Sequence, residues 1–244
     1  MALNKLYVVG IGPGEADQMT LRAMRVLEGC EVIAGYGVYV DLVKPLLPEK
    51  EYLVTPMRKE AERCRMAIDC ACEGKTVAMI SSGDAGVYGM AGLIYELAQG
   101  RELEVEVVPG VTAALSGGAV LGAPLTHDFA VISLSDLLTP WEKIEKRLDC
   151  AAQADLCIAI YNPASHRRAD YLHRACEILL RHASPVTVCG VVRNIGREGE
   201  AMQVMSLREL MDYQADMFTT VFIGNSQTKA IHGKMVTPRG YKDV

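Results

Sequence analysis

Residues 6–21 read LYVVGIGPGEADQMTL, and this stretch decides the fold of the first half of the chain. The apolar run 6–9 ends in a glycine-rich turn, and apolar residues then recur at helical spacing from Met19 to Leu27. A strand, a glycine turn and a helix in this order are typical of an α/β protein with a parallel sheet. The turn raises the question of whether it binds the phosphates of a dinucleotide.

The glycine turn departs from a dinucleotide-binding loop. Such a loop has the form GxGxxG, and its free amides point at a pyrophosphate at the start of a helix. Here the glycines are Gly10, Gly12 and Gly14, and Pro13 between them has no N–H to donate. Glu15 adds negative charge where a phosphate would lie. These residues argue against a pyrophosphate site and leave a tight turn or a different ligand contact open.

Strand and helix patterns continue to alternate through the first half of the chain. Strands are predicted over residues 31–36, 76–82 and 103–108, and helices over 57–73, where apolar residues fall on one face, and over 88–99. This alternation predicts a parallel sheet with helices on its faces. The uncharged stretch that follows is broken by prolines and glycines, so we expect a short buried helix there and no membrane span.

A second α/β domain is expected after the segment LGAPLTHDF, residues 121–129. Its glycine and proline predict a domain boundary near Pro124, which gives domains 1–124 and 125–244. Helices are expected to begin with a capping box at Thr139, after Ser165, and with the capping box SLRE at 206–209. Further strands are predicted at 129–134, 156–161, 185–192 and 218–223.

The composition of the chain excludes some classes of function. Half of the 244 residues are hydrophobic, and the formal charge of -5 gives no basic surplus for nucleic acid. Eight cysteines show no metal-binding spacing and are expected to be reduced core thiols. No signal-peptide pattern is present at the start, so we expect a cytoplasmic protein with no nucleic-acid or membrane partner.

A second glycine-rich turn, SSGDAGVYGMAG at 81–92, follows another predicted strand. Ligands of parallel α/β sheets bind outside the carboxyl ends of the strands, so both turns are expected on one edge. Asp84 is the only charge in a long neutral segment, and it is expected either to accept hydrogen bonds from a ligand or to cap a helix. Thr112 and Ala113, after the strand predicted at 103–108, are expected near the same edge, although a threonine there also fits a helix cap.

Three segments together resemble the tetrapyrrole methylases, whose S-adenosylmethionine site and substrate trough lie between two α/β domains. They are VVGIGPG at 8–14, SSGDAGVYG at 81–89 and PGVTA at 109–113. Four later segments most resemble the members that methylate C17 of a corrin precursor and contract its ring: residues 127–148, 158–168, 191–200 and 237–241. The resemblance covers essentially the whole chain. It implies this fold, this activity, a polycarboxylate tetrapyrrole substrate and a homodimer.

The resemblance also implies site residues. The matched donor-binding positions are Pro13, Gly83, Asp84, Val87, Thr112, Ala113 and Asn162. The first loop, with Gly12 and Gly14, borders the substrate trough. Relatives that methylate uroporphyrinogen carry an aspartate base after the second strand, whereas this chain has Tyr36, either a proton donor or a wall of the trough.

A substrate with many carboxylates requires cations. Three basic clusters are candidates, or else ordinary solvated faces: Arg58, Lys59 and Arg63; His166, Arg167 and Arg168; Arg193 and Arg197. His127 is a candidate proton carrier or axial contact to a corrinoid metal, or a structural hydrogen-bonding residue. Ser133 is a candidate at the trough rim. No protein-bound metal is expected, and cobalt would enter only with the substrate.

Other functions remain open at this point. A nucleotide-dependent oxidoreductase would also place glycine turns at strand ends, and it predicts dinucleotide binding. A non-catalytic tetrapyrrole carrier would use the same basic clusters without binding the methyl donor. Another precorrin methylase of the same family is the third alternative.

Overall fold

The computed structural model describes residues 4–165 and 169–242, and its chain divides into two compact units, Met1–Thr112 and Ala113–Val244. The division precedes helix α5 (Ala113–Leu121), so the boundary predicted near Pro124 is corrected. The reason is that α5 packs on the sheet of the second unit. A Cβ atom on Gly117 would lie 3.0 Å from the Phe222 ring, and one on Gly190 would lie 2.7 Å from Leu121.

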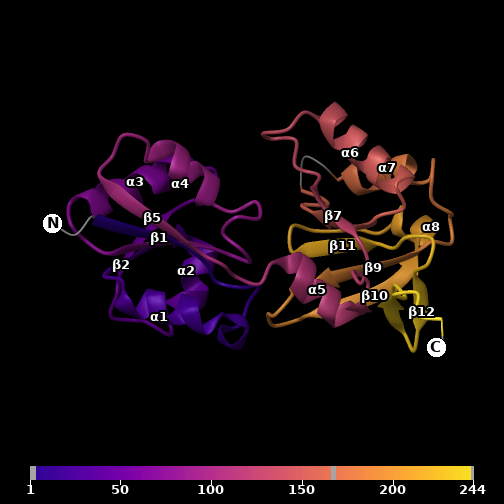
Figure 1. Ribbon diagram of the computed structural model, residues 1–244, viewed down its shortest axis with the longest axis horizontal. Helices are drawn as coiled ribbons and strands as arrows, with labels where there is room; N and C mark the ends of the chain where they lie inside the picture. Colours follow the sequence, from indigo (N-terminus) through magenta and orange to yellow (C-terminus); the bar gives the residue numbers. More distant parts are fainter. Residues whose placement is uncertain (1–3, 166–168, 243–244) are drawn as a thin grey trace. The chain divides into compact units, whose positions relative to one another are not determined.

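The first unit is a doubly wound α/β sheet. Its five strands are all parallel, in the order β3 (Glu51–Thr55), β2 (Val32–Tyr36), β4 (Val77–Ser81), β1 (Asn4–Gly10) and β5 (Leu103–Val108). Helices α1 (Leu21–Gly29) and α2 (Gly37–Val43) cover one face, and α3 (Glu60–Cys72) and α4 (Ala91–Leu97) cover the other (Figure 1).

The two-residue period of β1 explains this arrangement. Leu6 and Val8 pack among the residues of α3 and α4, whereas Val9 packs among those of α1 and α2. A strand buried on both faces appears in the sequence as a continuous apolar run. This is why the opening stretch of the chain predicted a parallel sheet, and that prediction is confirmed.

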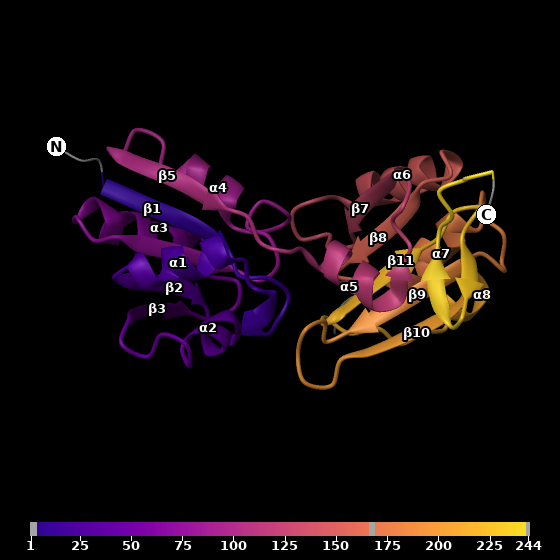
Figure 2. The ribbon, with the colours of Figure 1, turned by 60° about the horizontal axis from the view of Figure 1, so that its bottom comes forward.

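The second unit has a mixed sheet. Its strands lie in the order β10 (Ala201–Ser206), β9 (Val188–Arg193), β11 (Thr219–Ile223), β8 (Cys157–Tyr161) and β7 (Phe129–Ser133). Only the pair β7 and β8 is parallel; the other three pairs are antiparallel. Helices α6 (Trp141–Gln153) and α7 (Tyr171–Leu179) pack on one face and α5 on the other (Figure 2). The predicted class of two α/β domains is confirmed.

Short segments complete the second unit. A small sheet joins β12 (Lys229–Ile231), β13 (Lys234–Val236) and β6 (Gly122–Ala123). Helix α8 (Leu207–Leu210) begins with the predicted capping box, in which the Ser206 and Glu209 side chains each bond the other residue's backbone N–H.

Two predicted helix starts are wrong. Helix α6 begins at Trp141 with Pro140 as the residue before it, so Thr139 stands one position too early to cap it. Pro140 has an extended backbone, with φ -56° and ψ 144°, which occupies the capping position without a side-chain acceptor. The helix expected after Ser165 begins only at Tyr171.

The eight cysteines are all free. Burial raises the pKa of Cys30 and Cys176 to about 12 and that of Cys64 to about 11, so these thiols are poor nucleophiles at neutral pH. In the part of the chain that the structure describes, no helix is long and apolar enough to cross a membrane.

Three glycine backbones meet at the carboxyl edge of the first sheet. A Cβ atom on Gly110 would lie 2.1 Å from the Gly83 carbonyl oxygen and 2.6 Å from the Gly10 backbone. A Cβ atom on Gly10 would lie 2.7 Å from both the Gly83 oxygen and the Gly110 nitrogen. The ends of β1, β4 and β5 therefore approach one another at distances that only glycine permits.

We expect Gly110→Ala to lower the free energy of unfolding by about 1–3 kcal/mol, because the new methyl group overlaps backbone atoms that cannot move aside. The matched control is Gly92→Ala in α4, where a Cβ atom would meet nothing within 4 Å. That change should leave the stability unchanged or raise it by up to about 1 kcal/mol. Urea unfolding of the two variants tests this, and equal stabilities would contradict the close contact.

Candidate functional site

The first glycine loop is hydrogen-bonded to the turn after β4. The N–H of Gly12 donates to the Gly83 carbonyl at 3.1 Å, and the N–H of Gly83 donates to the Gly12 carbonyl at 2.7 Å. The N–H of Ile11 donates to the Ser81 carbonyl at 2.9 Å. The amides of Ile11 and Gly12 are thus already bonded to protein, and Pro13 has none to offer a pyrophosphate.

The helix after this loop also begins too far along the chain for its N-terminal amides to bind a phosphate at the glycines. Helix α1 begins at Leu21, and the Thr20 hydroxyl accepts the N–H of Ala23 at 3.1 Å and caps it. A short 3-10 turn, Ala16–Gln18, separates Gly14 from the helix. The positive end of α1 is therefore not at the glycines, in contrast to a dinucleotide-binding unit.

Asp84 links two turns at this edge. One carboxylate oxygen accepts the N–H of Gly110 at 2.9 Å, and the other accepts the N–H of Gly86 at 2.8 Å. The helix-cap interpretation is wrong, because α4 begins at Ala91 and its capping residue is Met90. The side chain instead fixes the turn after β4 to the turn after β5. Gly83 and the half-buried Val87 belong to the same turn.

A second group of predicted residues meets in the second unit. The Asn162 side-chain amide donates to the Ser133 hydroxyl at 2.9 Å. These residues follow or end the parallel strands β8 and β7, so the contact lies at the carboxyl ends of the pair. Asn162 is exposed and has φ 52°, a conformation in which asparagine is enriched.

Tyr161 connects this group to α5. Its hydroxyl oxygen accepts the N–H of Ala114 at 2.6 Å, so the tyrosine caps the start of the helix. Ala113 is the first residue of that helix, and Thr112 is the last residue of the first unit. The resemblance picked out Ala113 and Asn162, and sequence spacing gave no sign that Tyr161 joins their segments.

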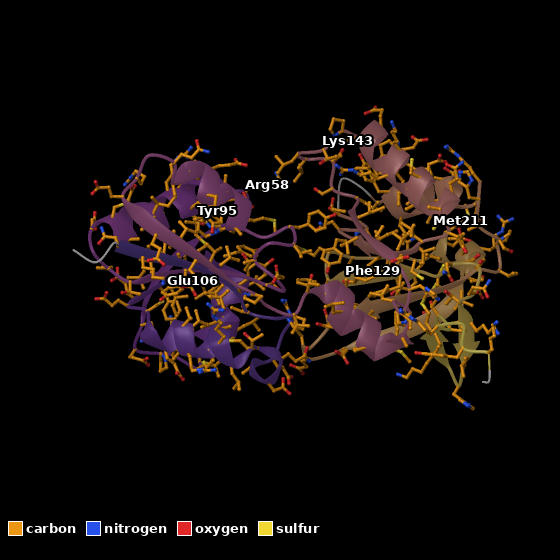
Figure 3. The ribbon with its side chains drawn as sticks, viewed as in Figure 1. Arg58, Tyr95, Glu106, Phe129, Lys143 and Met211 are labelled. Carbon is orange, nitrogen blue, oxygen red and sulfur yellow. The ribbon has the colours of Figure 1, made fainter. Side chains whose placement is uncertain are left out.

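The predicted cations differ in their surroundings. Arg58, labelled in Figure 3, is exposed and has φ 67°. Lys59 is exposed and pairs with Glu62 at 2.8 Å. Arg63 of the same predicted cluster is only 4% exposed, so the three do not form one surface patch.

The remaining basic residues belong to the second unit. Arg193 is paired with Asp216 at 2.9 Å, and the Arg197 guanidinium lies 5.8 Å from the centre of the Phe218 ring. Exposed ion pairs of this kind contribute little to stability. The cluster of His166, Arg167 and Arg168 lies outside the described residues.

Tyr36 lines a small cavity in the first unit. It precedes α2, and its ring contacts Tyr39 edge to face with 5.4 Å between centroids. The cavity measures about 80 Å³, and its lining includes Arg63 and Ser81. A larger hollow of about 430 Å³ contains none of the predicted site residues and lies near Thr76, at the amino end of β4.

His127 lies apart from the Ser133 group. It is exposed and precedes the amino end of β7, whereas Ser133 is the last residue of that strand. At roughly 3.3 Å per residue the two positions are about 20 Å apart. The structure does not bring His127 to the Ser133 edge.

The fold and the site define a class of protein: an α/β protein with glycine-rich loops at the carboxyl ends of parallel strands, the first of which does not lead directly into a helix as a dinucleotide-binding loop does. The family model for Tetrapyrrole (Corrin/Porphyrin) Methylases matches residues 5–211. The chain belongs to this family and is therefore a methyltransferase.

Individual relatives agree with the family. The probable cobalt-factor III C(17)-methyltransferase of Salmonella typhimurium is 47% identical, over 97% of this chain and 99% of the relative. The precorrin-3B C(17)-methyltransferase of Sinorhizobium sp is 40% identical, over 97% and 96%. The crystal structure of the methyltransferase CobJ matches with a TM-score of 0.89 and 36% identity, over 96% and 99%. In two longer relatives the match spans 53% and 45% of their length.

We expect Asp84→Ala to lower the free energy of unfolding by about 1–3 kcal/mol, because the Gly110 and Gly86 amides lose their acceptor. Asp84→Asn keeps one carbonyl oxygen and should lose less. The measurement is urea unfolding together with hydrogen exchange of the Gly110 amide, which should become faster in the alanine variant. Unchanged exchange would show that the carboxylate does not hold the turn.

Proposed function

We propose that this chain transfers a methyl group from S-adenosylmethionine to C17 of a corrin precursor and promotes contraction of the ring. The observation that carries the proposal is the match to C17-methyltransferases along nearly the full length of both chains. We take a cobalt-bearing precursor as the first candidate substrate, because the identity is 47% to the cobalt-factor III enzyme and 40% to the precorrin-3B enzyme.

The residues at the carboxyl edges suit a sulfonium donor better than a dinucleotide. The donor supplies an activated methyl group, carries positive charge at sulfur and has no phosphate. The first loop offers bonded amides and Pro13, and Asp84 supplies the only charge between residues 76 and 95. We assign donor binding to Gly83, Asp84 and Val87 in the first unit, with Pro13 and Thr112 beside them. In the second unit we assign donor binding to Ala113 and Asn162.

The substrate is proposed to bind through its carboxylates and ring face. Gly12 and Gly14 would contact the macrocycle, and Arg58, Lys59, Arg193 and Arg197 would supply positive charge. Ser133, fixed by Asn162, would stand at the rim of that site. We assign Tyr36, which lines the small cavity of the first unit, to the wall of the site or to proton donation during contraction.

The proposed methyl transfer depends mainly on alignment of the two reacting groups. A pyrrolic carbon is electron-rich, so methyl transfer needs the donor methyl and C17 in line more than it needs a strong base. Positioning alone can lower a barrier by about 7–11 kcal/mol. Loops held by backbone hydrogen bonds and close glycine contacts provide such positioning. A homodimer, which the resemblance implies, and a cytoplasmic location, which the amino-terminal sequence pattern suggests, stay predictions.

Turnover with methyl-labelled S-adenosylmethionine tests the proposal. Purified protein is incubated with cobalt-factor III or with precorrin-3B, and the product is examined by mass spectrometry and carbon NMR. We expect the mass gain of one methylation and the label on C17, with the faster rate on the cobalt-bearing substrate. A label on another carbon would assign the chain to a different corrin methylation, and no transfer to either substrate would contradict the proposal.

A further inference from the structure

Arg63 is a buried cation with no acidic partner. Its side chain on α3 is 4% exposed, and its guanidinium donates only through Nη1. The acceptors are the Thr55 hydroxyl at 2.6 Å, the Thr55 carbonyl at 3.4 Å and the Pro56 carbonyl at 3.5 Å. Within residues 4–165 and 169–242, no carboxylate lies within 4.0 Å of it, and neither Nε nor Nη2 makes a hydrogen bond.

Such an arrangement is unusual for an arginine. Buried charges in proteins are normally paired, because leaving water is costly and uncharged acceptors compensate only in part. Arginine has five N–H donors in a planar fork that matches a carboxylate at two points. In Arg63 only Nη1 is bonded, which fixes the position of the guanidinium, and Nε and Nη2 can donate to another partner.

The cavity beside Arg63 has room for that partner. It is lined by residues from the carboxyl ends of two neighbouring strands, Tyr36 of β2 and Ser81 of β4, while Thr55, which holds Arg63, ends the adjacent β3. Its volume of about 80 Å³ is far below the roughly 300–1,000 Å³ of a pocket that encloses a whole small ligand. The cavity therefore admits a substituent of a larger molecule.

We propose that Arg63 and this cavity form a subsite for one carboxylate side chain of the tetrapyrrole. The inference rests on the proposed function for the identity of the ligand. For the subsite it rests on a buried arginine beside the cavity whose guanidinium has no carboxylate partner and whose Nε and Nη2 are accessible and unbonded. Thr55 acts as a positioning residue that aims the fork. The exposed Arg58 and Lys59 are screened by water and bind less specifically than Arg63 does.

The test compares binding of a fluorescent porphyrin that has free carboxylates with binding of the same porphyrin fully esterified. We expect the wild-type chain to prefer the free acid, and Arg63→Met to lower affinity for the acid about 10- to 100-fold with little change for the ester. Arg65→Met, an exposed arginine on the same helix, is the matched control and should bind as wild type does. A wild-type chain with no preference for the acid, or an Arg63→Met chain that keeps it, would overturn the subsite.

Further variants separate this role from a structural one. Arg63→Lys keeps the charge without the fork, and Thr55→Val removes the hydroxyl that orients it, so each should weaken acid binding severalfold while S-adenosylhomocysteine binding stays unchanged. If Arg63→Met does not fold, Arg63→Lys decides the question, and wild-type affinity in that variant would overturn the subsite. Wild-type turnover is measured in parallel. Its absence would contradict the proposed function, whereas active enzyme with no acid preference would contradict only the subsite.

Discussion

The close approach of the Gly10, Gly83 and Gly110 backbones is the constraint on which the first unit's ligand edge depends. It brings the ends of β1, β4 and β5 within hydrogen-bonding reach, and the reciprocal bonds between Gly12 and Gly83 follow from it. Asp84 then joins the turns after β4 and β5 through two backbone amides. Each of these hydrogen bonds occupies a backbone N–H that would otherwise be free to bind a phosphate. The edge that results is held by backbone contacts and hydrogen bonds, which suits a donor without phosphates.

This constraint explains why similar glycine turns serve different ligands. In a dinucleotide-binding unit the glycines lead directly into a helix whose free amides face the ligand. Here a proline and a 3-10 turn separate the glycines from α1, and Thr20 caps that helix. The glycines serve backbone packing between loops. The same residue type thus has two physical uses, and the positions of Pro13 and Asp84 distinguish them.

Much of the fold was predictable from the sequence. The buried parallel strands β1 and β4 contain continuous apolar runs, the edge strand β5 alternates apolar and charged residues over its first half, and the capping box of α8 has its full signature. Strands β3 and β10 lie at sheet edges with exposed residues, so their patterns are weak and sequence analysis did not find them. The domain boundary was misplaced because an uncharged helix packs equally well on either side of a linker. Only the contacts of α5 assign it to the second unit.

The candidate site was predictable to a smaller extent. Family motifs located the turns that carry Asp84 and Asn162, but spacing could not show that Asp84 binds the Gly110 amide or that Asn162 binds Ser133. Sequence analysis grouped Arg63 with Arg58 and Lys59 because they are neighbours in the chain. Arg58 and Lys59 precede α3 and are exposed, whereas Arg63 lies in the first turn of that helix and is buried.

We propose that the loops at the carboxyl ends of β1, β4 and β5 bind a sulfonium donor and no dinucleotide. Calorimetric titration of the purified chain with S-adenosylhomocysteine, and separately with NAD, tests it most directly. We expect saturable binding of S-adenosylhomocysteine and no heat of binding when NAD is added. Binding of NAD without binding of S-adenosylhomocysteine would contradict it.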